Sequence, residues 1–197
     1  MSKKELMDEI AKEIFECKKC TLWKFRRNPV PGEGSLDAKI MFIGEAPGYW
    51  EDVKGKPFVG AAGKLLDSLL AGIGLSRSEV FIGNILKCRP PENRDPQPEE
   101  VKACTPYLDR QIKIIKPRII VTLGRHATSY IFSKTGMPFS GISRVHGKVY
   151  HVELFDSEIV LIPMYHPAAA LYNVKLRDAL EEDFKVLESE IKSISFR

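Results

Sequence analysis

The sequence has no long uninterrupted run of apolar residues, and none approaches the roughly 18 residues that cross a membrane as a helix. Its first fifteen residues, MSKKELMDEIAKEIF, intersperse charged residues with apolar ones at helical spacing. That pattern excludes the continuous apolar core of a secretory signal peptide. We therefore expect a soluble protein that stays inside the cell and has no membrane partner.

An excess of one charge is also lacking. The 30 lysines and arginines against 26 aspartates and glutamates give a net charge of only +4, which favours a polyanionic partner weakly. Internal repeats and low-complexity segments are absent. With 197 residues, 44% of them hydrophobic and 28% charged, the chain can bury one substantial core. We predict a single domain over residues 1–197.

Cysteine is scarce, but its four positions are informative. Cys17 and Cys20 form a C-x-x-C pair after the first predicted helix, while Cys88 and Cys104 lie far downstream with fifteen residues between them. In a reducing cytosol this pattern favours a metal site over disulfides, with free structural cysteines as the alternative. Four thiolates bind either a tetrahedral zinc ion or an iron–sulfur cluster, and the spacing alone does not separate the two.

The segment CKKCTLWKFRRN, residues 17–28, holds five basic residues and no acidic one. Trp23 and Phe25 lie between these basic residues. Basic and aromatic side chains together are typical of a nucleic-acid surface. The alternative is that the aromatic rings pack under a metal loop while the lysines around them are solvated.

Hydrophobic periodicity and turn residues divide the rest of the chain into elements. We predict helices over residues 3–16, 61–71, 99–115, 124–132 and 175–193, and strands over residues 39–43, 80–84, 118–123, 149–154 and 158–164. The last two strands form a hairpin whose second strand joins the main sheet. Because strands alternate with helices, we predict an α/β fold of three layers, α/β/α, around a central four-stranded, mainly parallel sheet.

Polar residues follow three of these strands. Glu45 lies in the tight turn GEAPG at residues 44–48, Asn84 ends the second strand, and His166 follows the last one. The carboxyl edge of an open α/β sheet is where ligands bind, so residues that converge there predict a site. Phe58 and Glu51 lie just beyond the turn and extend this candidate site. The alternative for each residue alone is an ordinary cap, turn or core residue.

Four motifs carry a family resemblance: GEAPGYWED at 44–52, KPFVGAAGKLLD at 56–67, GNILKCRPPENRDP at 83–96 and HPAAALYN at 166–173. Together with the four cysteines, they resemble the family 4 uracil-DNA glycosylases of bacteria and archaea over nearly the whole chain. The resemblance implies a uracil-DNA glycosylase fold and a monofunctional base-excision repair enzyme that removes uracil from DNA. It also implies a structural [4Fe–4S] cluster, ligated by Cys17, Cys20, Cys88 and Cys104.

The resemblance further implies a role for each site residue. Uracil must be flipped out of the duplex, and Leu171 is the expected wedge that fills the vacated stack. Phe58 would stack on the flipped ring, and Asn84 would hydrogen-bond its edge. Glu51 would crowd C5, so that the methyl group of thymine does not fit. His166 would donate to O2 as negative charge builds on the leaving uracil.

Water activation is the step that the resemblance leaves open. In related single-domain uracil glycosylases an aspartate of the first motif handles the attacking water. Here Ala46 occupies that position, where the resemblance implies a substrate-binding residue. Glu45 is the nearest carboxylate, and it either polarises water, stabilises the sugar cation or shapes the pocket.

Two other functions are alternatives to this one. The chain could be an iron–sulfur electron carrier, or a nucleic-acid-binding module that zinc stabilises and that has no catalytic activity. The expected partner is DNA that contains uracil, with repair or replication proteins as further partners. We expect a monomer in the cytoplasm, associated with the nucleoid.

Overall fold

The computed structural model describes residues 1–195, and within them one sheet of six strands runs through the centre of the molecule, in the order β1-β3-β2-β4-β6-β5. The strands are β1 (Glu33–Gly34), β2 (Ile40–Gly44), β3 (Phe81–Asn84), β4 (Ile119–Leu123), β5 (Tyr150–Leu154) and β6 (Ser157–Met164). Strands β3, β2, β4 and β6 are parallel, and β1 and β5 pair antiparallel at the two edges. The predicted α/β class and mainly parallel sheet are confirmed.

The sheet has two strands more than the four predicted. Strand β5 joins the sheet through the predicted hairpin, because it pairs with β6 along its whole length. Strand β1 has only two residues in a glycine- and proline-rich stretch, so no alternating pattern marks it in the sequence. Gly34 lets β1 approach its neighbour closely: its φ is +135°, and a Cβ there would lie 1.9 Å from the carbonyl oxygen of Val80.

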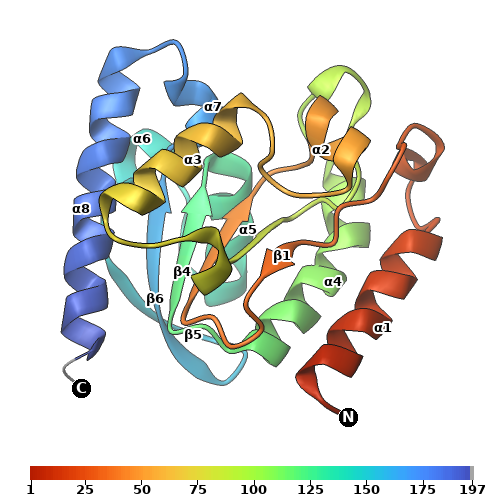
Figure 1. The fold of residues 1–197 in the computed structure, drawn as a ribbon, viewed down its shortest axis with the longest axis horizontal. Helices are drawn as coiled ribbons and strands as arrows, with labels where there is room; N and C mark the ends of the chain where they lie inside the picture. The colour runs from red at the N-terminus through yellow and green to blue at the C-terminus, as the bar shows by residue number, and fades with distance from the viewer. Residues whose placement is uncertain (196–197) are drawn as a thin grey trace.

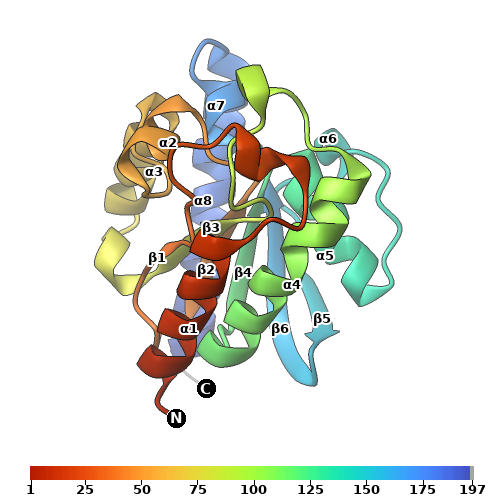
Figure 2. The same cartoon turned by 90° about the vertical axis from the view of Figure 1, so that its right-hand side faces the viewer.

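Helices cover both faces of the sheet (Figures 1 and 2). They are α1 (Lys3–Glu16), α2 (Tyr49–Lys54), α3 (Ala61–Gly72), α4 (Pro98–Ile115), α5 (Arg125–Thr135), α6 (Ile142–Val145), α7 (Pro167–Ala170) and α8 (Val174–Ser195). The long helices lie where the periodicity predicts them. Helices α2, α6 and α7 have only four to six residues, too few for a helical period to show in the sequence. In the described part of the chain, no helix is long and apolar enough to cross a membrane.

Two hydrophobic cores sandwich the sheet, because successive side chains of a strand point to opposite faces. Met41 and Ile43 of β2 pack with helices α1, α4 and α5, whereas Ile40 and Phe42 pack with α3 and α8. All of these β2 residues are buried. Burial on both faces explains why the parallel strands read as continuous apolar runs in the sequence.

The parallel register brings the carboxyl ends of four strands to one edge of the sheet. Gly44 of β2 is paired with Asn84 of β3, and Leu123 of β4 with Met164 of β6. The loops that follow these strands carry Glu45 and His166 to the same edge. The fold therefore positions the polar strand ends that the sequence singled out.

Candidate functional site

A pocket opens at this carboxyl edge, between α2, α3 and the loop that carries His166. Its walls include Ala46, Tyr49, Trp50, Glu51, Phe58, Asn84, Asn93, His166 and Leu171. Glu45 lies in an adjoining cleft that shares Ala46, Glu51 and His166 with the pocket. The structure thus brings together all seven residues that the sequence predicted outside the cysteines.

Asn84 lines the pocket, and its side-chain oxygen lacks a hydrogen-bond donor within the described residues. Its side chain is 2% exposed, and its Oδ1 has no hydrogen-bond partner among the described residues. A buried acceptor left without a donor costs about 1–3 kcal/mol. Gly44 makes room for this amide: a Cβ at Gly44 would lie 2.5 Å from Asn84 Oδ1 and 2.8 Å from the Phe58 ring. The arrangement is that of a site that receives a donor from a bound molecule.

His166 is a neutral donor aimed at the same pocket. The backbone N–H of Ala168 donates to His166 Nδ1 at 3.0 Å, so the neutral imidazole carries its proton on Nε2. Burial lowers the pKa of His166 to about 4, although the nearby Glu51 opposes this shift. The Phe58 ring lies against the imidazole, with centroids 5.4 Å apart and planes inclined by 23°. At neutral pH the pocket therefore presents an uncharged N–H group beside an aromatic ring.

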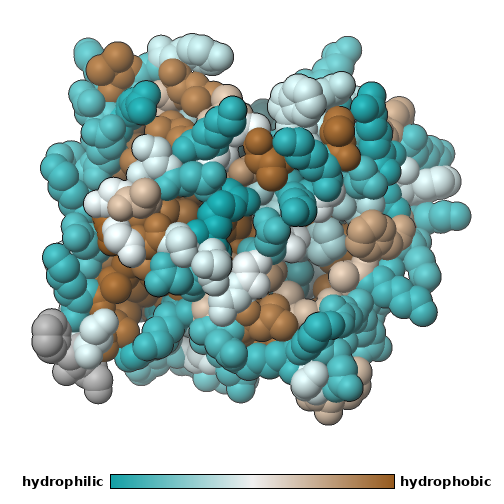
Figure 3. Space-filling view, in the orientation of Figure 1, coloured by the Kyte–Doolittle hydropathy of each residue, from teal (hydrophilic) through white to brown (hydrophobic). Residues whose placement is uncertain are grey.

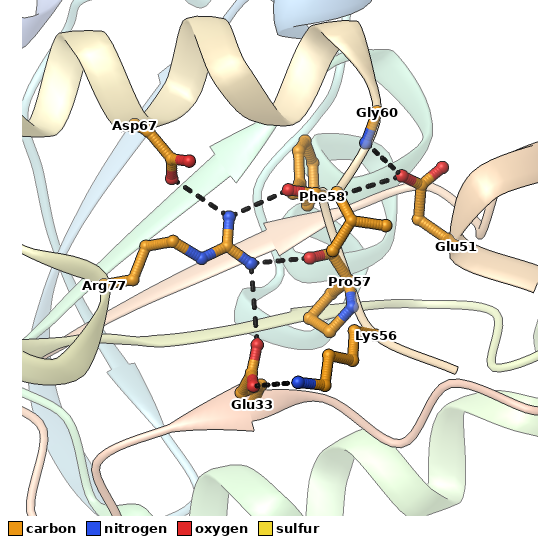
Figure 4. A network of polar contacts seen from close by, with 9 residues as sticks. Glu33, Glu51, Lys56, Pro57, Phe58, Gly60, Asp67 and Arg77 are labelled. Atoms are coloured by element: carbon orange, nitrogen blue, oxygen red, sulfur yellow. Dashed lines mark hydrogen bonds and ion pairs between the residues drawn. The ribbon is translucent and has the colours of Figure 1, made fainter. Parts of the chain in front are cut away.

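Phe58 is held in a conformation that L residues rarely adopt. Its φ is +49°, in the left-handed region, where a residue with a Cβ pays about 1–2 kcal/mol. Arg77 stabilises this turn by donating to the carbonyl oxygens of Phe58 at 2.9 Å and Pro57 at 2.6 Å (Figure 4). Asp67 pairs with the same guanidinium at 3.1 Å. Arg77 is a positioning residue that no sequence pattern indicated, because it lies outside the four motifs.

Glu51 joins the two loops that frame the pocket. Its carboxylate accepts hydrogen bonds from the backbone N–H groups of Gly48 at 3.0 Å, Val59 at 2.9 Å and Gly60 at 2.8 Å. The last two bonds appear in Figure 4. Residue 48 belongs to the GEAPG turn, and residues 59 and 60 directly follow Phe58. One side chain therefore fixes the turn after β2 relative to the aromatic wall of the pocket.

The four cysteines meet in a second cavity that shares no lining residue with the first pocket. It lies between α1, α4 and the loop after β3, and Trp23 and Lys87 also line it. The Arg26 guanidinium donates to Cys88 Sγ at 3.2 Å, and the backbone N–H of Lys87 donates to Cys104 Sγ at 3.1 Å. Trp23 thus packs at the cysteines, as one of the two interpretations of residues 17–28 predicted, while Phe25 is 59% exposed.

The chemistry of these cysteines fits a metal centre. Burial raises the pKa of Cys104 to about 12 and also raises the pKa of Cys88, so metal binding at these thiols would release protons. The nearby cations of Arg26 and Lys87 offset the charge of the resulting thiolates. Among the described residues, no three cysteine sulfurs lie within 4.8 Å of one another. A single tetrahedral zinc ion would hold its sulfurs about 3.8 Å apart.

The sequence is similar to known proteins over most of its length. Residues 31–188 match the Uracil DNA glycosylase superfamily. The chain is 61% identical to a type-4 uracil-DNA glycosylase of Sulfurisphaera tokodaii, with 91% of this chain and 82% of the relative covered. A type-4 uracil-DNA glycosylase of Archaeoglobus fulgidus is 55% identical, with 92% of this chain and 91% of the relative covered. One of Thermotoga maritima is 43% identical, with 97% of each chain covered. The chain belongs to the type-4 uracil-DNA glycosylases.

In this type-4 chain, Glu45 has two neighbours that the sequence reasoning missed. His126 Nε2 lies 3.9 Å from Glu45 Oε2 and 3.6 Å from Asp95 Oδ1, and Asp95 in turn pairs with Arg125 at 2.5 Å. Burial raises the pKa of Glu45, and the His126 ring opposes that rise. His126 follows the carboxyl end of β4, so the rule that identified the other strand ends applies to it as well. Asp95 lies in the proline-rich loop after β3, where no such signal exists.

Proposed function

We infer that this protein is a uracil-DNA glycosylase: it hydrolyses the N-glycosidic bond of uracil in DNA, leaves an abasic site and so initiates base excision repair. The observation in the structure that best supports this function is the buried Oδ1 of Asn84, which has no partner within the described residues and faces the pocket of Phe58 and His166. The N3–H group of uracil supplies the missing donor, and the amide of Asn84 can also donate to O4.

We propose that the base reaches this pocket by flipping out of the helix. A base inside a duplex is inaccessible, so extrusion must precede the reaction. Leu171 lines the pocket from the loop between α7 and α8 and can fill the gap that the base leaves in the stack. Phe58, 6% exposed and fixed by Arg77, provides an aromatic surface for the flipped ring.

The same proposal assigns bond cleavage to His166. As the bond to the sugar breaks, negative charge accumulates on uracil O2, and a preorganised neutral donor stabilises it. The Nε2–H tautomer, fixed by the Ala168 N–H group, gives His166 that role. Glu45 lies in the adjoining cleft beside Ala46 and acts on the sugar cation or on the attacking water. Ala46 lines the pocket without a polar group, so it cannot activate water itself.

Discrimination against thymine rests on Glu51 in this proposal. One methyl group changes binding by only about 1–3 kcal/mol in a compliant pocket, so a rigid obstacle is needed at C5. The three backbone hydrogen bonds of Glu51 immobilise both its carboxylate and the surrounding loop. A methyl group pushed against this carboxylate would desolvate it without replacing its contacts with water.

We propose that Cys17, Cys20, Cys88 and Cys104 hold a [4Fe–4S] cluster. The shared cavity, the wide spacing of the sulfurs and the adjacent cations of Arg26 and Lys87 support this assignment. When bound, the cluster supplies four covalent links between the start of the chain, the loop after β3 and helix α4. Its cavity is separate from the uracil pocket, which supports a structural role.

We also propose that the chain acts as a single domain and a monomer on uracil-containing DNA, inside the cell and associated with the nucleoid. Repair or replication proteins are its expected further partners. Membership in the type-4 uracil-DNA glycosylases supports the DNA substrate and the intracellular location.

The test is direct. The purified protein is incubated with single- and double-stranded oligonucleotides that contain one uracil, and abasic sites are detected by alkaline strand cleavage. Matched oligonucleotides with thymine in place of uracil are the control. We expect cleavage of the uracil strand only. An electron carrier or a non-catalytic binding module would produce no abasic site, so absence of cleavage would refute the function.

A further inference from the structure

Helix α2, at the mouth of the uracil pocket, has an inverted polarity. Its two aromatic residues face outward, with Tyr49 43% exposed and Trp50 53% exposed. Its two acidic residues face inward: Glu51 accepts from backbone N–H groups, and Asp52, 3% exposed, accepts from the backbone N–H of Arg27 at 2.8 Å. A surface helix normally places its apolar side chains inward and its charges outward. Exposed aromatic rings in the opposite arrangement indicate a binding surface.

Three cations surround these rings. The guanidinium carbons of Arg27 and Arg89 lie 5.5 Å and 5.4 Å from the centroid of the Tyr49 ring, and Lys54 Nζ lies 5.9 Å from that of Trp50. Throughout residues 1–195, none of the three forms an ion pair with a carboxylate. Because the acids of α2 point inward, the surface combines aromatic rings with unneutralised positive charge. That combination suits an anionic polymer with stackable bases.

The position of this surface determines which part of a DNA strand can reach it. Tyr49 and Trp50 line the same pocket as Asn84, and Leu171 lines it as well. In Figure 3 the upper edge of the molecule is hollowed between α2 and the segment around α3 and α7. Nucleotides next to a base held in this pocket are therefore within reach of Tyr49 and Trp50.

We propose that Tyr49 and Trp50, with Arg27, Arg89 and Lys54, form a stacking platform for an unpaired base beside the flipped uracil. The rings contact the base and the cations contact its phosphates. In a duplex the faces of each base are covered by its neighbours, so only an unpaired strand can use the platform. This inference rests on the proposed function, and it assigns to the enzyme a binding site for single-stranded DNA.

The variant that tests the platform is Trp50→Ala, compared with Trp50→Phe. Dissociation constants are measured by fluorescence anisotropy for a uracil-free single strand of about 15 nucleotides, in the size range of single-strand sites, and for the corresponding duplex. Loss of one base-stacking ring weakens single-strand binding by about 5- to 150-fold. Because Tyr49 remains, we expect the ratio of single-strand to duplex affinity to fall about tenfold in Trp50→Ala. Trp50→Phe keeps a stacking ring and should recover most of this ratio.

Phe15→Ala is the matched control, because Phe15 has the same 53% exposure but lies on α1 and lines none of the pocket walls. Its affinity ratio should equal that of the wild type. Arg27→Gln and Arg89→Gln should each reduce the slope of log affinity against log salt for the single strand by about 0.7. If the wild type releases uracil but Trp50→Ala has the same ratio of single-strand to duplex affinity, the platform alone is refuted. A wild type that releases no uracil would instead refute the proposed function.

Discussion

Replacing Glu51 with alanine tests how the structure holds its pocket together. The substitution removes the acceptor of three backbone N–H groups, on Gly48, Val59 and Gly60. Hydrogen bonds to a charged group contribute roughly 1.5–3 kcal/mol each, which would sum to about 5–9 kcal/mol. Glu51 is partly exposed, so water can replace its carboxylate at some of these donors. We therefore expect a loss of about 2–4 kcal/mol in the free energy of unfolding.

Circular dichroism during heating measures this loss. For a protein of this size, 1 kcal/mol corresponds to a shift in Tm of roughly 2–4 °C, so Tm should fall by about 5–15 °C. Glu5→Ala is the control, because Glu5 caps the exposed start of α1 by accepting from a single backbone N–H, that of Ser2 at 2.6 Å, and it does not line the pocket. Its Tm should fall by less than about 4 °C.

Activity assays then separate the two consequences of Glu51→Ala. Loosening of the turn and of Phe58 should slow uracil excision, and loss of the obstacle at C5 should allow weak thymine release, most readily from a mismatch, where flipping costs less. A variant with an unchanged Tm and full uracil excision would show that Glu51 is a surface carboxylate. A destabilised variant that still releases no thymine from a mismatch would assign discrimination to the shape of the backbone.

Four further predictions concern His166, Arg77 and the cysteines. His166→Ala should slow single-turnover excision about 10²- to 10³-fold with little change in DNA binding, and near-normal excision would remove His166 from the mechanism. The pKa of His166 is about 4 in the folded protein and 6.5 ordinarily, so its contribution to stability is complete above pH 6.5 and is lost as the pH falls towards 4. In denaturant unfolding at several pH values, His166→Gln should lack this loss of stability between pH 6.5 and 4. Arg77→Ala should slow excision about 10- to 100-fold by releasing Phe58, with partial recovery in Arg77→Lys, whereas a wild-type rate would show that Phe58 keeps its position without Arg77. Anaerobically purified protein should be brown, with broad absorbance near roughly 400 nm that Cys88→Ser diminishes together with Tm, while a colourless protein with stoichiometric zinc would contradict the cluster.

The sequence alone determined the elements whose formation depends on nearby residues. Helix α1 begins at the capping box of Ser2 and Glu5 and occupies the range that its periodicity predicts. Strands β2 and β4 were recognisable as apolar runs because both of their faces are buried. From these strands followed the candidate site, since the ends of parallel strands share one edge. Glu45, Asn84 and His166 were found in this way, and His126 could have been.

Only the tertiary structure decided the contacts that connect distant segments. Arg77 supports Phe58 across 19 positions of the chain, and Asp95 reaches the neighbourhood of Glu45 from the loop after β3. The inward orientation of Glu51 and Asp52, which leaves Trp50 exposed, likewise depends on which backbone N–H groups lie nearby. Periodicity reports the burial of a side chain relative to its own element. It carries no information on the partners that a polar side chain finds when separate loops fold against one another, and those partners set the geometry of this pocket.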